Sequence, residues 1–406
     1  MWKRTDALSE RVKFILEWER RWKAAQGRID VAELSRIYGV SRQTAHVWIK
    51  RYQDAGHDLR AMQERSRRPS SNPRAVSLNM QHRLVAARKQ HPRWGPLKLR
   101  AWLVERHPQI SFPSVSGIGA VLRRRGMTAA RKPRRGTAVS ATIAAPFPDC
   151  ERPNDVWCMD FKGWFLTHDS VKCYPFTLID ALSRMLLRCE ALTEPSGDFV
   201  RHILDSAFRE YGLPKRLRSD GGPPFFSAAS PASLSKLGVW LLRLGITLEC
   251  IAPAKPQQNG RLERFHRTLK LEVGVTSDWR SQQRAFDSFR GTYNTERPHA
   301  ALGLVPPAAV HRRSTCHYPR GLLSTGDTPG HTEQVDRRGW LRWRPRNVFL
   351  GEALALERVS LWPGESDAWE VYLGAILLGH IDLSTDRGFV PRRRGKGPMR
   401  LSLIDE

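Results

Sequence analysis

Cysteine is scarce in this chain of 406 residues, which holds six cysteines and no pair with the C-x-x-C spacing of a zinc knuckle. The six lie scattered between residues 150 and 316: Cys150, Cys158, Cys173, Cys189, Cys250 and Cys316. The spacing argues against a zinc knuckle. Scattered thiols without a signal peptide fit a reducing cytosol, so the sequence predicts a cytoplasmic protein.

Long hydrophobic runs are missing as well. The most apolar stretch, Val239–Leu244, is interrupted by Arg243 and is too short to span a bilayer. The first residues, Met1–Asp6, contain no apolar core that could act as a signal, and no short tandem repeat is present. We therefore expect no membrane partner.

Acidic residues are few, with 40 Asp and Glu against 67 Lys and Arg, which gives a net charge of +27. Residues 1–135 alone carry 31 basic and 10 acidic side chains. An excess of this size favours a polyanionic partner, and nucleic acid is the usual one. Hydrophobic residues still make up 40% of the chain, which is enough for two to four domains with cores of their own.

The first 62 residues follow a helix-turn-helix pattern. Residues 8–25 alternate apolar and charged positions at helical spacing. Asp30 starts a capping box for a second helix, Gly39 supplies a tight turn, and Ser41 caps a third helix that runs through Tyr52.

The third helix is the candidate for reading DNA. It is expected to expose Arg42, Gln43, His46 and Lys50. Its core side is expected to carry Ala45, Val47, Trp48 and Ile49. A short helical hairpin with a solvated basic face remains the alternative.

A second helical region follows a basic linker. Pro96–Arg106 and Pro113–Arg125 are expected to be helices. Arg123 and Arg124 end the latter and are predicted to bind DNA, although arginines at that place also stabilise the negative end of a helix dipole.

From Asp155 onward, short apolar strands are followed by alternating helices and strands, which predicts an α/β sandwich with a mixed sheet. Short strands near the C-terminus predict a small all-β barrel. The predicted parts are a first helix-turn-helix domain (1–62), a basic linker (63–76), a second helical DNA-binding domain (77–127), a linker (128–150), the α/β core (151–310), a linker (311–334), the barrel (335–391) and a basic tail (392–406).

Three carboxylates stand out within the core. Asp160 lies in mid-strand, where a charge is unfavourable unless it is paired. Asp220 follows a strand and precedes a sharp Gly-Gly turn, which is a usual position for functional groups. Glu263 lies early in a long helix, and His266, Arg267 and Lys270 follow on the same predicted face.

Three convergent carboxylates suit two-metal phosphodiester chemistry, with two Mg²⁺ or Mn²⁺ ions. For any single acid, a surface carboxylate or an ion pair is the simpler interpretation. Four other acids could be mistaken for ligands: Asp155, Asp169, Asp180 and Glu272. Of these, Asp180 is expected to cap a turn or to pair with Arg184.

Four segments together resemble bacterial insertion-sequence transposases of the D-D-E superfamily, which also includes retroviral integrases. They are Trp157–Lys162 (WCMDFK), Leu217–Phe225 (LRSDGGPPF), Pro256–Lys270 (PQQNGRLERFHRTLK) and Tyr293–His299 (YNTERPH). The third segment is the most specific. The fourth also has a simpler interpretation, in which it ends the last core helix at Pro298.

The resemblance implies a ribonuclease-H-like core, Mg²⁺-dependent cleavage at element ends, and joining to target DNA. It places the catalytic and metal-binding acids at Asp160, Asp220 and Glu263. Lys270 becomes a DNA contact, and Asn259 and Arg267 are predicted contacts beside it. It further implies binding to terminal inverted repeats, a homo-oligomer of at least two subunits, and a protein of the bacterial cytoplasm, associated with the nucleoid.

Two departures from the pattern stand out. Gly221 replaces an Asn that is common after the second Asp, and residues 227–234 look like a loop insertion. Neither change removes a carboxylate, so a DNA transposase is the prediction. The alternatives are a non-catalytic sequence-specific DNA-binding protein derived from a transposase, and a nuclease that cuts RNA in hybrids.

Overall fold

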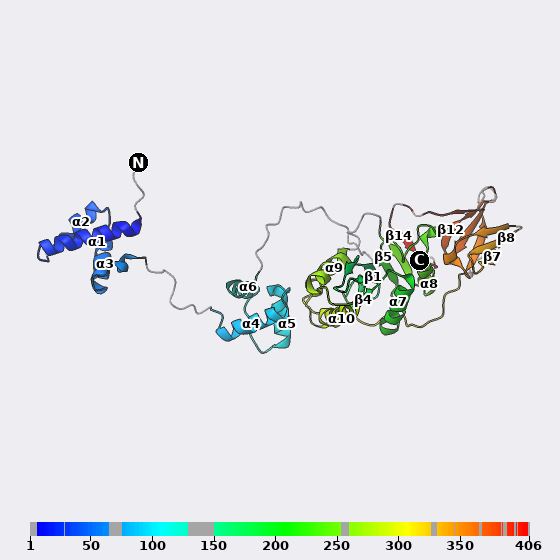
Figure 1. Cartoon of the computed structure of the whole chain (residues 1–406), viewed down its shortest axis with the longest axis horizontal. Helices are drawn as coiled ribbons and strands as arrows, with labels where there is room; N and C mark the ends of the chain where they lie inside the picture. The colour runs from blue at the N-terminus through cyan, green and yellow to red at the C-terminus, as the bar shows by residue number, and fades with distance from the viewer. Residues whose placement is uncertain are drawn as a thin grey trace. The chain divides into compact units, whose positions relative to one another are not determined.

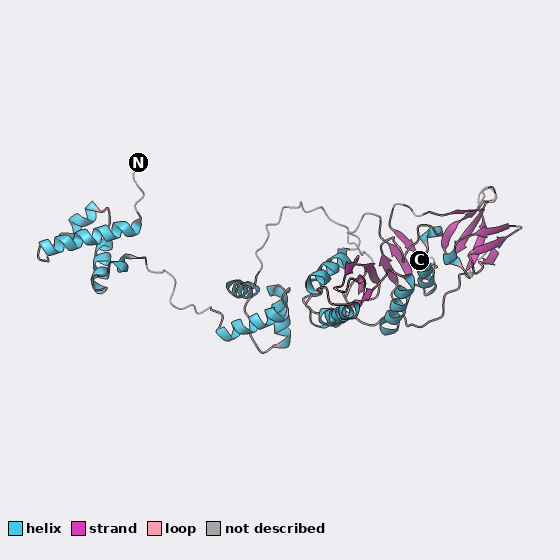
Figure 2. Cartoon of the chain, in the orientation of Figure 1, coloured by secondary structure: helices cyan, strands magenta, loops and turns pink. Residues whose placement is uncertain are grey.

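The computed structural model describes residues 6–27, 29–64, 75–128, 150–252, 260–325, 331–344, 346–364, 368–382, 384, 388–393, 395 and 397–404. The chain forms two compact units, Met1–Ala75 and Val76–Glu406. The first unit is helical, and the second begins with helices and continues into strands (Figure 2). None of the described helices combines the length and apolar character needed to cross a bilayer.

The first unit contains a helix-turn-helix (Figure 1). Its elements are α1 (Ala7–Ala24), α2 (Val31–Ile37), α3 (Arg42–Asp54) and a short 3₁₀ turn (Leu59–Met62). Asp30 caps α2 by accepting a hydrogen bond from the Ala32 amide, and Ser41 caps α3 by accepting one from Thr44. Gly39 lies between the two helices with φ +63°, which glycine adopts without strain.

The outer face of α3 matches the prediction with one exception. Arg42, Gln43, His46 and Lys50 are all exposed. Val47 is 56% exposed, so its assignment to the core is wrong. It follows Gln43 by four positions and precedes Lys50 by three, which places it on their helical face.

The second unit begins with three helices where the sequence pattern indicates two. They are α4 (Leu78–Gln90), α5 (Pro96–Arg106) and α6 (Val115–Arg124). We call them the second helical module; Leu84, Leu99 and Ile118 are fully buried within it. α6 begins at Val115 with Ser114 as its N-cap, two residues after the predicted start at Pro113. Arg123 and Arg124 are exposed in its last turn.

A mixed sheet forms the centre of this unit, as the sequence predicted. Its strands are β1 (Val156–Phe161), β2 (Phe165–Leu166), β3 (Lys172–Asp180), β4 (Leu186–Leu192), β5 (Arg216–Ser219), β6 (Thr247–Cys250) and β14 (Met399–Leu401). The order is β14-β6-β5-β1-β3-β2, with β4 also paired to β3. β1, β5 and β6 run parallel, whereas β3, β4 and β14 pair antiparallel with their neighbours.

Helices cover both faces of this sheet. They are α7 (Gly197–Tyr211), α8 (Lys236–Arg243), α9 (Gly260–Glu272) and α10 (Trp279–Thr295), followed by the short α11 (Pro307–Val310). Trp157 and Met159 of β1 pack with α7 and α8, whereas Val156 and Cys158 pack with α9 and α10. Since side chains alternate along a strand, Asp160 belongs to the α9 face.

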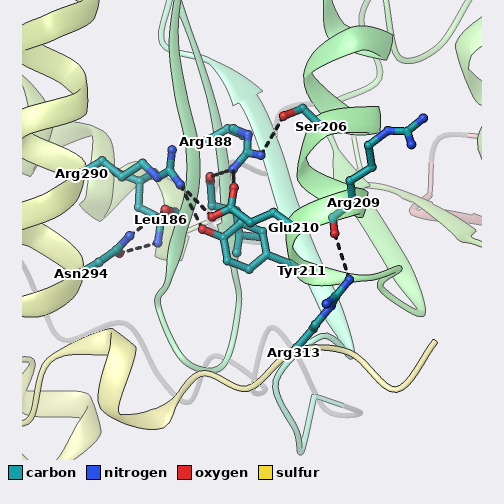
Figure 3. A network of polar contacts seen from close by, with 10 residues as sticks. Leu186, Arg188, Ser206, Arg209, Glu210, Tyr211, Arg290, Asn294 and Arg313 are labelled. Atoms are coloured by element: carbon teal, nitrogen blue, oxygen red, sulfur yellow. Dashed lines mark hydrogen bonds and ion pairs between the residues drawn. The ribbon is translucent and has the colours of Figure 1, made fainter. Parts of the chain in front are cut away.

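An ion-pair network joins the helix layers at β4. Glu210 of α7 accepts from Arg188 of β4 at 2.7 Å and from Arg290 of α10 at 3.3 Å (Figure 3). Arg290 also donates to the Tyr211 hydroxyl. These contacts hold α7 and α10 against the same strand from opposite sides.

The C-terminal part is all β, but its described strands do not close into the predicted barrel. They form a five-stranded sheet, β13-β12-β11-β10-β7, and a separate β8–β9 hairpin. The bounds are β7 (His331–Gln334), β8 (Trp340–Trp343), β9 (Arg346–Phe349), β10 (Arg358–Pro363), β11 (Trp369–Leu373), β12 (Ile376–Ile381) and β13 (Phe389–Pro391).

The C-terminal sheets share one hydrophobic core with α7 and α8. The insertion at residues 227–234 forms part of this contact, because it contains a 3₁₀ turn, Pro231–Ser233, next to β12. The Ala232 amide donates to the carbonyl oxygen of Arg392. The extra residues therefore have a structural use in this chain.

The segment expected to be a basic tail contains β14, which extends the central sheet at β6. Arg400 of β14 lies 3.0 Å from the carboxylate of Glu249, whose side chain is 8% exposed. Arg218 and Arg216 of β5 approach the same carboxylate at 2.8 and 3.5 Å. Glu249 thus balances three arginines.

We predict that Glu249→Gln lowers the free energy of unfolding by about 3 kcal/mol, because it removes the buried carboxylate that three arginines share. Urea denaturation of the full chain measures this change. Glu194→Gln, at an exposed position, is the control and should leave stability within about 0.5 kcal/mol. A Glu249→Gln variant as stable as this control would contradict the prediction.

Candidate active site

The pairing of β1 with β5 brings Asp160 and Asp220 side by side. Val156 pairs with Arg216, and Cys158 with Arg218. Continued for two more residues, this register places Asp160 opposite Asp220 at the carboxyl ends of two parallel strands. Their side chains then share one face of the sheet.

Helix α9 lies over the same face. His266 of α9 is buried, and its Nδ1 lies 3.9 Å from a carboxylate oxygen of Asp160. Its Nε2 is 2.8 Å from the hydroxyl of Thr177, the cross-strand partner of Asp160 in β3. Glu263 precedes His266 by one helical turn and is exposed.

The hydrogen bonds around Thr177 determine the tautomer of His266. The Thr177 hydroxyl donates to the carbonyl oxygen of Asp160 at 3.1 Å. A hydroxyl has one proton, so Nε2 of His266 must donate to Thr177. Nδ1 is then unprotonated and directs a lone pair toward the Asp160 carboxyl group.

The surroundings of Asp160 disfavour its charged form. Burial, together with the charges of Asp220 and Glu263, raises the pKa of Asp160 to about 7. Burial and the charge of Lys162 lower the pKa of His266 to about 3. The ring is therefore neutral at pH 7, and its contact with Asp160 is not an ion pair.

The three acids do not form a tight cluster. Asp220 and Glu263 are exposed, and Asp220 accepts a hydrogen bond from the Gly222 amide at 3.3 Å. Within the described ranges, no three His, Cys, Asp or Glu side chains stand close enough to hold one metal ion. The structure thus places Asp160 and Asp220 at the carboxyl ends of neighbouring strands, and Glu263 on the helix that packs over that face of the sheet.

The predicted DNA contacts on α9 have separate outcomes. Arg267 and Lys270 are exposed on the same side of the helix as Glu263. His266, expected on that face, instead joins the buried stripe of Leu262 and Leu269. His266 lies four residues after Leu262 and three before Leu269, and this helical spacing could have predicted that its side chain is buried. Asn259 lies outside the described residues.

Each of the four acids set aside as possible false ligands has its own structural partners. Asp180 is buried and accepts from the amides of Ser183 and Asn154 at 2.7 Å, so it caps a turn. Asp155 pairs with Lys215. Asp169 accepts a hydrogen bond from the Thr167 hydroxyl, and Glu272 pairs with Arg297.

Comparison with known families agrees with this architecture. Two models described as integrase core domain match residues 151–256, which include Asp160 and Asp220, and residues 244–307, which include Glu263. A model described as homeodomain-like domain matches residues 44–122. The protein therefore belongs to a class in which an integrase core domain follows a homeodomain-like helical region.

Two relatives define the family. The 31.7 kDa protein of insertion element IS407 from Burkholderia multivorans is 30% identical over 58% of this chain and 83% of its own length. The 39.2 kDa protein of insertion element IS476 from Xanthomonas euvesicatoria is 28% identical over 58% and 65%. The chain belongs to the bacterial insertion-sequence transposases of the retroviral integrase superfamily.

Among solved structures, the catalytic core domain of HTLV-2 integrase in complex with magnesium aligns with 40% of this chain and 98% of its own. The sequence identity is 14% and the TM-score 0.32.

The neutral state of His266 can be tested by NMR. Because its pKa in the folded chain lies below that of a free histidine, the ring should not titrate between pH 8 and 5. The stability linked to this ring is then lost as the pH falls below about 6.5, where the unfolded chain binds the proton. In the urea-unfolded chain the same ring should titrate near 6.5; a folded-state midpoint above pH 6 would contradict the assignment.

Proposed function

We propose that this chain is a DNA transposase that binds the terminal inverted repeats of its element, cleaves a strand at each end and joins it to target DNA. The observation that carries the proposal is the β1–β5 register, which places Asp160 beside Asp220 under the helix that bears Glu263. Membership of the transposase family supports the same reaction.

The chemistry of the donor set fits divalent cations. Asp160, Asp220 and Glu263 offer hard oxygen ligands, which suit Mg²⁺ or Mn²⁺. Burial, and after it the charges of Asp220 and Glu263, raise the pKa of Asp160, and a cation at this place would relieve that unfavourable charge. We propose that the three acids hold two ions, which would neutralise charge on the phosphodiester and favour deprotonation of the attacking hydroxyl.

The proposed reaction has two displacements at phosphorus. In the first, water attacks a phosphodiester at the element end, and the 3′ oxygen leaves and takes up a proton. In the second, this 3′ hydroxyl attacks a target phosphodiester, and the 3′ oxygen of the target strand leaves. No covalent enzyme intermediate is needed, because positioning and charge neutralisation lower the barrier.

DNA binding is assigned to three surfaces. The exposed face of α3 is proposed to reach base edges, with phosphate contacts adding affinity. Arg123 and Arg124 of α6 are proposed to contact the second part of an end, and Arg267 and Lys270 of α9 the DNA beside the acids. Joining two ends requires at least two subunits.

A non-catalytic DNA-binding protein derived from a transposase would need only the helical modules. It would have no use for three acids gathered at one place, so we favour the enzyme. A nuclease for RNA hybrids would not need two helical DNA-binding regions. Metal-dependent nicking of a duplex that carries the element end separates the first alternative from our proposal, and a hybrid substrate separates the second.

We expect Asp160→Asn, Asp220→Asn and Glu263→Gln each to reduce cleavage and strand transfer by at least about 100-fold, because each removes a charged ligand. Binding to the element end should change little. Cleavage of a labelled end duplex in Mg²⁺ and gel-shift titration measure the two effects. Asp169→Asn is the matched control and should cleave normally; normal strand transfer by any of the three variants would remove that residue from the site.

Arg42→Ala or Lys50→Ala should weaken binding to the element end. Each lost phosphate contact should lower the slope of log affinity against log salt by about 1. Arg20→Ala, which removes a charge already paired with Glu17 on α1, serves as the control. If the salt slope is unchanged in either variant, that side chain does not contact a phosphate.

A further inference from the structure

The Tyr293–His299 segment does more than end a helix. α10 ends at Thr295, before Pro298, as the simpler interpretation expects. However, residues just before and just after the end of α10 contact two different parts of the fold. They contact the central core on one side and the second helical module on the other.

The contacts toward the core are buried. Asn294 accepts from the Leu186 amide and donates to its carbonyl oxygen, both at 2.9 Å, which holds α10 against β4 (Figure 3). Arg297 pairs with Glu272, and the two side chains are 9% and 17% exposed. Glu272 is the last residue of α9, so Arg297 is tied to the helix that carries Glu263.

The contacts toward the second helical module come from the next residues. The Glu296 carboxylate lies 3.2 Å from the guanidinium of Arg106 in α5 and 3.7 Å from Nε2 of His91. The Arg297 guanidinium lies 5.9 Å from the ring of Trp94. Glu296 and Arg297 therefore face the module with one charge of each sign.

The module presents a preorganised surface at this place. His91 stacks on Trp94 with ring centroids 3.7 Å apart, and Arg106 lies 4.4 Å over the ring of Trp102. His91, Trp94 and Trp102 are buried. Within the described residues, Nε2 of His91 has no hydrogen-bond partner, so the carboxylate of Glu296 is the polar group that it faces.

We propose that Glu296 and Arg297 are positioning residues that fix the second helical module to the catalytic core at a set distance from Asp160. This inference rests on the proposed function. The path runs from α5 through Arg106 and Glu296 to α10, and through Arg297 and Glu272 to α9. A DNA end held by the module is thereby presented to the three acids instead of being tethered loosely beside them.

A purely structural contact would affect stability alone, whereas a positioning contact acts on turnover at unchanged DNA affinity. Arg106→Glu and Glu296→Arg should each lower the cleavage rate on saturating end DNA at least tenfold, with DNA affinity within twofold of wild type. The double variant, which restores opposite charges, should recover most of the rate. Arg106→Ala, which creates no repulsion, should give an intermediate loss.

The matched control is the pair Lys236 and Glu352, which lie 3.2 Å apart and are both 72% exposed. Lys236→Glu, Glu352→Lys and their double variant should cleave at the wild-type rate. Single variants at Arg106 and Glu296 that cleave normally would overturn the proposal. So would a double variant no better than either single variant, or a loss explained by lower thermal stability.

A second measurement does not depend on catalysis. In a chain with Cys316→Ser, the pair Arg106→Cys and Glu296→Cys should be joined within one chain by a short bis-maleimide, and the pair Arg123→Cys and Glu296→Cys should not. Absence of the first product, or a product between two chains, would overturn the intrachain contact. If the wild-type chain cuts no DNA but the cross-link forms, the proposed function fails and the docking stands.

Discussion

The parallel register of β1 and β5 is the constraint on which the candidate site depends. Trp157 and Leu217 pair in this register, and both are buried on the α7 face. A slip of one residue would turn one strand's core residues toward the opposite helices and send its acid to the other face. The hydrophobic core therefore fixes the relation between Asp160 and Asp220.

Helix α9 adds the third acid through a mixture of apolar and polar contacts. Leu262, Phe265 and Leu269 set its buried face, and the His266–Thr177 hydrogen bond sets its position along β1 and β3. Arg297 holds its last residue. Asp220 and Glu263 can remain exposed and Asp160 half-buried because the packing beneath them, and not contacts among the three acids, holds them in place.

The sequence predicted the fold where the pattern is local. Helix α5 has the predicted bounds, Pro96–Arg106, and the cap at Ser41 marks α3 correctly. The sequence pattern did not predict α4, because the apolar periodicity of this helix is weak and its first residue, Leu78, is 67% exposed. It also missed β7, β13 and β14, which are only three or four residues long and take their structure from neighbouring strands. The acids were identified from local context, but their convergence depends on strand register, and the inward turn of His266 depends on packing.

Strand β14 has a consequence for synthesis. The edge of β6 is covered by residues 399–401, which leave the ribosome about 150 residues after β6 itself. Until then the nascent core has an open strand edge at β6, and Glu249 faces Arg216 and Arg218 without Arg400. The central sheet can therefore be completed only late in translation. A product that terminates before β14 would expose the unpaired edge of β6. Such an edge can pair with strands of other chains, so this product would be prone to aggregate.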